Sequence, residues 1–84
     1  MKKVAQDIVD AIDGGAVYSF NNGEFEFKAR RVPPSPFFDG EYMLTIRVYW
    51  REGEGIGQVL DSPKSLLREM KRHAKLTEWK VEGA

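Results

Sequence analysis

The sequence predicts a small α+β domain in which an antiparallel sheet carries two helices on one face. Residues 2–13 and 61–76 show the helical period, with apolar side chains recurring every three to four positions. Between them, residues 24–32 and 41–52 alternate apolar and polar side chains, which is typical of strands with one buried and one wet face. The expected element order is therefore α-β-β-β-α-β.

Composition indicates one globular domain over residues 1–84, since 42% of the residues are hydrophobic and 31% are charged. The absence of cysteine excludes disulfides and thiolate zinc sites. Lys2-Lys3 could begin a signal peptide, but Gln6, Asp7 and Asp10 interrupt any apolar run. No stretch reaches the ~18 apolar residues that would span a membrane. We therefore expect a cytoplasmic protein without a membrane contact.

The first half of the chain reads as a helix followed by a hairpin. Gly14-Gly15 is expected to end the helix over 2–13. Strands are predicted at 16–20 and 24–32, and they flank Asn21-Asn22-Gly23. An Asn-Gly pair supplies the positive φ angles that tight hairpins need, so this is the strongest local signal in the chain.

The middle of the chain is expected to contribute a loop, a central strand and a connection. Residues 33–40 hold three of the four prolines and cannot continue a central strand, because proline has no amide hydrogen. Residues 41–52 alternate again and form the predicted third strand. The glycine-rich residues 53–58 are interpreted as a mobile connection to the second helix, because their glycines lack the spacing of a phosphate-binding loop.

Ser62 is predicted to cap the second helix, with Pro63 in its first turn. Residues 78–83 are interpreted as a short closing strand. The two helices and three strands should share one core. Its expected members are Ile8, Phe25, Phe27, Leu44, Ile46, Val48, Leu67 and Met70, with Trp50 on the same side of its strand.

Five cations of the second helix share one face on a helical wheel, within an arc of about 100° at about 100° per residue. They are Lys64, Arg68, Lys71, Arg72 and Lys75. Such a row suits phosphates or carboxylates, although most charged stripes are only solvated. Residues 62–76 carry a net charge of +4, which leaves −4 for the rest of this neutral chain. This balance favours an acidic protein surface over nucleic acid as the partner.

Phe37-Phe38 is the main uncharged candidate for a contact. Two adjacent aromatic rings on a proline-stiffened loop rarely both find cover within their own chain. Two interpretations are open: the rings contact a partner, or one or both of them fold back over the open end of the core.

No catalytic, cofactor or metal site is predicted. His73 is the only histidine, and Asp7 and Asp13 are expected about 120° apart on their helix, so they do not converge as ligands. In element order alone, the chain resembles double-stranded RNA-binding domains. Asn21-Asn22-Gly23 and a second helix with only Lys64 near its start depart from the loop and the lysine cluster of that family. No functional residue is therefore carried over.

The sequence thus predicts a small non-catalytic binding protein that acts through protein-protein contacts, as an inhibitor or accessory protein. In size and lack of motifs it is similar in general character to small accessory proteins of bacteria and their phages. The alternative is a nucleic-acid-binding module that uses the basic face of the second helix. The candidate partner-binding residues are Phe37, Phe38, Lys64, Arg68, Lys71, Arg72 and Lys75.

Overall fold

The computed structural model describes residues 2–33, 36–37, 40–48 and 55–82. It confirms the α+β class, with one strand more than the sequence predicted, in the order α-β-β-β-β-α-β. The elements are α1 (Lys2–Asp13), β1 (Val17–Asn21), β2 (Phe25–Arg31), β3 (Tyr42–Val48), β4 (Gly55–Leu60), α2 (Pro63–His73), the short 3₁₀ helix η1 (Leu76–Glu78) and β5 (Lys80–Glu82).

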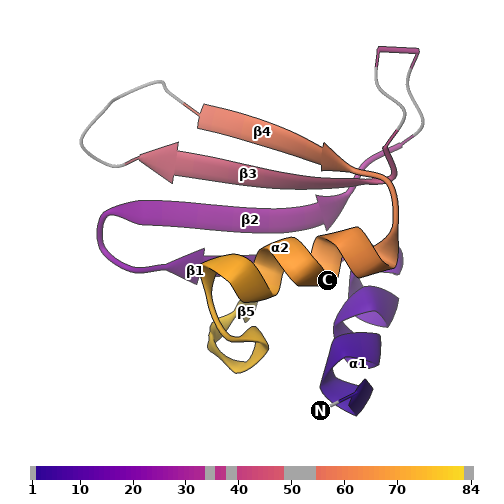
Figure 1. Cartoon of the computed structure of the whole chain (residues 1–84), viewed down its shortest axis with the longest axis horizontal. Coiled ribbons are helices and arrows are strands. Elements are labelled where there is room, and N and C mark those ends of the chain that lie inside the picture. The colour runs from indigo at the N-terminus through magenta and orange to yellow at the C-terminus, as the bar shows by residue number, and fades with distance from the viewer. Residues whose placement is uncertain (1, 34–35, 38–39, 49–54, 83–84) are drawn as a thin grey trace.

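The five strands form one antiparallel sheet in the order β4-β3-β2-β1-β5. β1 to β4 follow one another as a meander, and the chain returns through α2 to add β5 beside β1. Figure 1 shows α2 lying across the sheet and α1 below it. One face of the sheet is therefore covered, and the other is open.

β4 corrects the prediction that residues 53–58 only connect a strand to a helix. Residues 55–60 pair with β3 over six positions, from Gly55 opposite Arg47 to Leu60 opposite Tyr42. Residues 53 and 54 lie outside the described residues. The glycines at 55 and 57 hid the strand, because a residue without a side chain leaves no alternation to read.

α1 ends as predicted at Gly14-Gly15. Gly15 takes a φ of 106°, which an L side chain rarely adopts. The amide of Gly15 donates to the carbonyl of Ile12 and that of Ala16 to the carbonyl of Ala11, at 3.0 and 2.9 Å. This pair of bonds is the Schellman arrangement, and it turns the chain from α1 into β1.

The predicted hairpin between β1 and β2 is present, with a different turn from the one expected. Only Gly23 takes a positive φ, of 91°. The two asparagines act through their side chains instead. Asn21 Oδ1 accepts from the Gly23 amide at 2.8 Å, and Asn22 Oδ1 accepts from the amides of Glu24 and Phe25 at 3.0 and 2.8 Å. Asparagine is frequent in turns for this reason.

One core fills the space between the helices and the sheet, as predicted. Of the expected members, Ile8, Phe27, Leu44 and Met70 are buried in it. Phe25, Ile46 and Leu67 are only partly buried and pack against it, and Val48 is half-buried outside this cluster. Trp50 lies outside the described residues. The cluster also contains Ile12, Ala29, Tyr42, Leu60, Leu66 and Trp79.

Trp79 fastens the end of α2 to the core. Its indole Nε1 donates to the carbonyl oxygen of Met70 at 3.1 Å, and its ring lies 5.9 Å from that of Phe20. The same carbonyl also accepts the backbone amide of Ala74 at 3.0 Å, so the indole adds a second hydrogen bond at the end of α2. It also fixes where the chain turns toward β5.

Candidate functional site

Phe37 is the most exposed large apolar residue in the described part of the chain, with 91% of its surface accessible. Pro36 beside it is also exposed. Figure 1 shows these two residues beyond the end of the sheet, at the upper right. The ring therefore does not lie over the core, which was the alternative to a partner contact. Phe38, the second predicted contact, lies outside the described residues.

The five predicted cations of the second helix region are all exposed. Arg72 has an ion pair, between its Nη1 and Glu69 Oε2 at 3.7 Å. Within the part of the chain that the structure describes, Lys64, Arg68, Lys71 and Lys75 make none. Four positive charges are therefore left for an external partner or for solvent.

The helix ends earlier than its period suggested, and this changes the place of Lys75. α2 stops at His73, and Ala74 is extended, with φ of −163° and ψ of 162°. Lys75 therefore lies in the turn before η1 and is not on the face of α2, where the wheel had placed it. Its position there brings it beside Lys71 at the rim of a groove.

This groove runs between α1, α2 and η1, and its volume is about 550 Å³. Such a volume falls within the ~300–1,000 Å³ that is usual for ligand clefts. Its lining residues are Val4 and Ala5 from α1, Leu67 and Lys71 from α2, and Lys75, Leu76 and Thr77 from the segment that follows. We call it the interhelical groove. Among the described residues, its lining combines aliphatic side chains with two lysines and contains no carboxylate.

Sequence reasoning found the two lysines of the groove and missed its apolar lining. Leu67 was expected in the core, but it is only half-buried. Val4 is 39% exposed although it lies on the apolar arc of α1. An apolar residue near the end of an amphipathic helix is a weak signal for such a site, because many of them are covered by another element.

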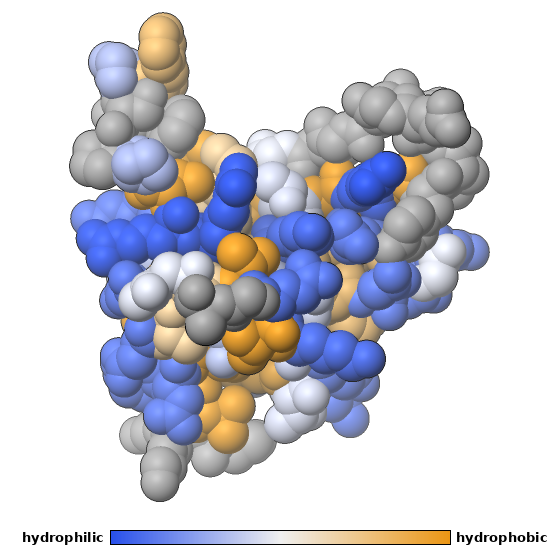
Figure 2. All heavy atoms as spheres, turned by 180° about the vertical axis from the view of Figure 1, so that it is seen from behind, coloured by the Kyte–Doolittle hydropathy of each residue, from blue (hydrophilic) through white to orange (hydrophobic). Residues whose placement is uncertain are grey.

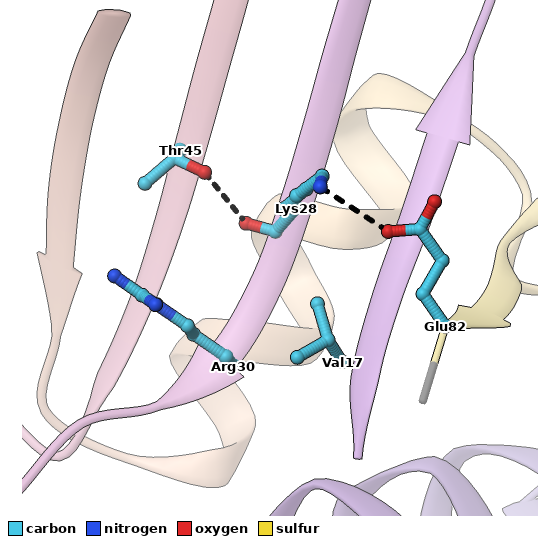
Figure 3. Close-up of a pocket in the computed structure, with 5 residues that line it drawn as sticks. All are labelled: Val17, Lys28, Arg30, Thr45 and Glu82. Atoms are coloured by element: carbon cyan, nitrogen blue, oxygen red, sulfur yellow. Dashed lines mark hydrogen bonds and ion pairs between the residues drawn. The ribbon is translucent and has the colours of Figure 1, made fainter. Parts of the chain in front are cut away.

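The open face of the sheet carries a second hollow, of about 530 Å³. Figure 2 shows this side of the molecule, on which hydrophilic residues surround a smaller hydrophobic area. Figure 3 shows the five lining residues, which come from β1, β2, β3 and β5. They are Val17, Lys28, Arg30, Thr45 and Glu82.

The cation at the centre of this open face, Lys28, already forms ion pairs within the chain. Lys28 Nζ lies 3.3 Å from Glu82 Oε2 and 3.8 Å from Glu26 Oε1. Glu26 and Lys28 lie two positions apart on β2, so both side chains point to the same face of the sheet. Because the central lysine already faces two carboxylates, the open face attracts an anion less than the cations near α2 do.

Family models, curated proteins and solved structures gave no significant match to this chain. Within the described ranges, no three histidine, aspartate or glutamate side chains gather as metal ligands would. None of the helices in those ranges is long and apolar enough to span a bilayer.

Proposed function

We propose that this chain is a small, non-catalytic binding protein that acts through protein-protein contacts, as an inhibitor or accessory protein of bacterial or phage type. The observation that carries the proposal is the exposure of Phe37 at 91%. The lack of cysteine fits a reducing compartment, and we propose the cytoplasm as its location.

Covering an exposed aromatic ring with a partner surface is favourable, because it removes apolar area from water. A buried aromatic side chain removes roughly 150–250 Å² from solvent, which at roughly 25 cal/mol per Å² corresponds to several kcal/mol. Aromatic residues are enriched among the side chains that dominate binding at protein interfaces. Proline beside Phe37 restricts the backbone, so less conformational entropy is lost when the segment docks.

Charge supports an acidic or apolar protein surface as the partner. Lys64, Arg68, Lys71 and Lys75 are exposed and make no ion pair in the described residues. Positive side chains at the rim of an interface accelerate association with an acidic surface and select against basic ones. The −4 charge of the remaining chain limits long-range attraction to a polyanion.

The test is a pull-down from lysate with the wild-type chain and with Phe37→Ser, each with and without nuclease treatment. We expect the wild-type chain to retain a specific protein that nuclease does not release, and Phe37→Ser to lose it. The melting temperature should stay nearly unchanged, because the ring is exposed. Phe37→Ser/Phe38→Ser extends the test to the neighbouring ring.

Val81→Ser is the matched control, because Val81 is also apolar and is 53% exposed in β5. This variant should retain the partner. Equal losses in Val81→Ser and Phe37→Ser would indicate unspecific apolar adhesion, and a large drop in melting temperature for Phe37→Ser would show that the ring supports the fold. Either result would contradict the proposal.

The alternative, a nucleic-acid-binding module, is favoured by the same four cations without ion pairs. If it were correct, Arg68→Glu/Lys71→Glu should weaken binding to many sequences alike, and affinity should fall steeply with salt as counterions are released. We expect no tight binding to random duplex or single-stranded DNA or RNA near physiological salt. Sub-micromolar, salt-sensitive binding in a fluorescence anisotropy titration would replace the proposed function by this alternative.

A further inference from the structure

The interhelical groove exposes aliphatic side chains next to two lysines. Val4, Ala5, Leu67 and Leu76 bring aliphatic surface to it from three separate segments. None of the four is fully buried, and Leu67 and Leu76 also pack against the core. An occupant that covers them would remove apolar surface from water without any change in the fold.

Two cations at the groove determine the charge of a suitable occupant. Lys71 and Lys75 line it, both are exposed, and neither has an ion pair within the described residues. No aspartate or glutamate is among the lining residues that the structure describes. An acidic side chain placed at the rim would therefore gain an opposite charge, whereas a basic one would be repelled.

The walls of the groove determine the backbone conformation of the occupant. α1 and α2 satisfy most of their own amides and carbonyls, so the groove offers side chains and not a strand edge. Thr77 contributes an uncharged polar side chain to the lining. An extended peptide would leave its own amides and carbonyls without partners against Leu67 and Leu76, whereas a helix satisfies them internally.

We propose that the interhelical groove binds an amphipathic helix of a partner protein. Its apolar residues would recur at i, i+3 or i+4 and i+7 against the groove, with aspartate or glutamate beside Lys71 and Lys75. This inference rests on the proposed function, because it takes the partner to be a protein. It assigns a contact that does not include Phe37.

The test is a selection from a phage-displayed library of random peptides of about 16 residues, a length at which an isolated helix begins to form. The full chain is the target, and Lys71→Glu/Lys75→Glu is used for counter-selection. We expect the surviving peptides to be acidic, with apolar residues at helical spacing. Methyl signals of Val4, Leu67 and Leu76 should shift on addition of a selected peptide in an NMR titration.

Lys64→Glu/Arg68→Glu is the matched control, because it makes the same change in net charge, lies on α2 as Lys71 does, and involves neither of the lysines that line the groove. Binding of a selected peptide should weaken about tenfold or more in Lys71→Glu/Lys75→Glu and less than about threefold in the control. Lys71→Gln/Lys75→Gln should lose an intermediate amount of affinity. Because this variant adds no carboxylate, a loss of affinity in it does not come from misfolding caused by two new acidic residues.

Three outcomes would overturn the inference: no peptide is enriched, the enriched peptides lack acidic residues, or the two charge-reversed variants lose affinity equally. Phe37→Ser separates this inference from the proposed function. If peptide binding depends on Phe37 and not on Lys71 and Lys75, the result is compatible with the proposed function but contradicts peptide binding in the groove. Peptides that bind Phe37→Ser unchanged would support the groove even if that variant still captured its partner from lysate.

Discussion

Tyr42 is the residue whose chemistry most directly connects α1 with the sheet. Its hydroxyl donates to Asp13 Oδ1 at 2.8 Å, and Arg31 Nη1 lies 3.6 Å from the same oxygen. Tyr42 is only 2% exposed. Burial, followed by the hydrogen bond to the Asp13 carboxylate, raises the pKa of Tyr42 from 10.0 to about 12. The folded state therefore favours the neutral phenol.

This shift predicts how stability depends on alkaline pH. A group whose pKa is raised by folding stabilises the protein fully below the unfolded pKa, and that contribution is lost as pH rises from about 10 to about 12. The full loss corresponds to about 2.7 kcal/mol at two pH units. Tyr42→Phe removes this contribution, because phenylalanine does not ionise.

We expect Tyr42→Phe to lower the free energy of unfolding by about 1 kcal/mol near neutral pH, through loss of the hydrogen bond. Above pH 10 the difference should shrink and then reverse, because only the wild-type chain must keep a buried phenol protonated. Urea denaturation of both proteins between pH 7 and 11 measures this difference in the free energy of unfolding. If the free energies of unfolding of the two proteins differ by the same amount at every pH, ionisation of Tyr42 does not determine the loss of stability at alkaline pH.

Single residues also show how far sequence alone reaches for the candidate site. Exposure of Phe37 was predictable, because it is flanked by proline and belongs to no alternating segment. The position of Lys75 was not. No glycine or proline marks the end of α2, and the turn there follows from Trp79, which is buried and bonds to the carbonyl of Met70. That contact is tertiary, and a helical period cannot reveal it.

At the scale of elements, α2 begins where local chemistry says it should. Ser62 is its N-cap, with extended φ and ψ of −150° and 158°, and its Oγ accepts from the Ser65 amide at 3.2 Å. Pro63 follows in the first turn. Both features were readable from the sequence, because capping depends on residues adjacent in the chain.

Ser62→Ala should therefore destabilise the protein by about 0.5–2 kcal/mol, because the Ser65 amide loses its acceptor. Ser62→Asp should stay close to the wild-type value, since aspartate caps about as well as serine and its charge suits a helix N-terminus. Chemical denaturation followed by circular dichroism compares the three proteins. Equal losses in both variants would mean that Ser62 acts through something other than its cap.

β4 shows the opposite case, an element that only its neighbours define. Of the side chains that could alternate, Val59 faces the open side and Leu60 the core, while Gly57 contributes none. Pairing with β3 stabilises the strand. Gly40 also packs against it: a Cβ there would lie 1.8 Å from Val59 Cγ1. The need for glycine at position 40 appears only once β4 is in place.

At the scale of the whole molecule, the two candidate contacts lie far apart. The segment of residues 36–37 lies beyond the sheet at the upper right of Figure 1, and the first residues of α1, next to the interhelical groove, lie at the bottom. One occupant of the groove would not reach Phe37 unless it were large. The two contacts therefore suit either one extended partner or two partners held by one small chain.

We expect β5 to open while the rest of the domain stays folded. It has three residues, all exposed, and it pairs with β1 alone. The other pairings of β1 to β4 join strands that are consecutive in the chain, whereas this one joins residues 17–19 to 80–82. Trp79, directly before β5, is buried and stays behind as an anchor. Detachment of β5 would leave β1 as a temporary edge strand.

Amide hydrogen exchange would make this opening visible. Backbone amides of β1 that point toward β2 should exchange only through global unfolding, whereas those that point toward β5 should exchange through the smaller opening, at rates close to those of β5 itself. Neighbouring amides along a single strand would then alternate between slow and fast exchange. Uniform protection along β1 in a native-state exchange series would mean that β5 opens only with the whole domain. If the alternation is found, the edge of β1 is periodically available for pairing with another strand, although the folded structure covers it.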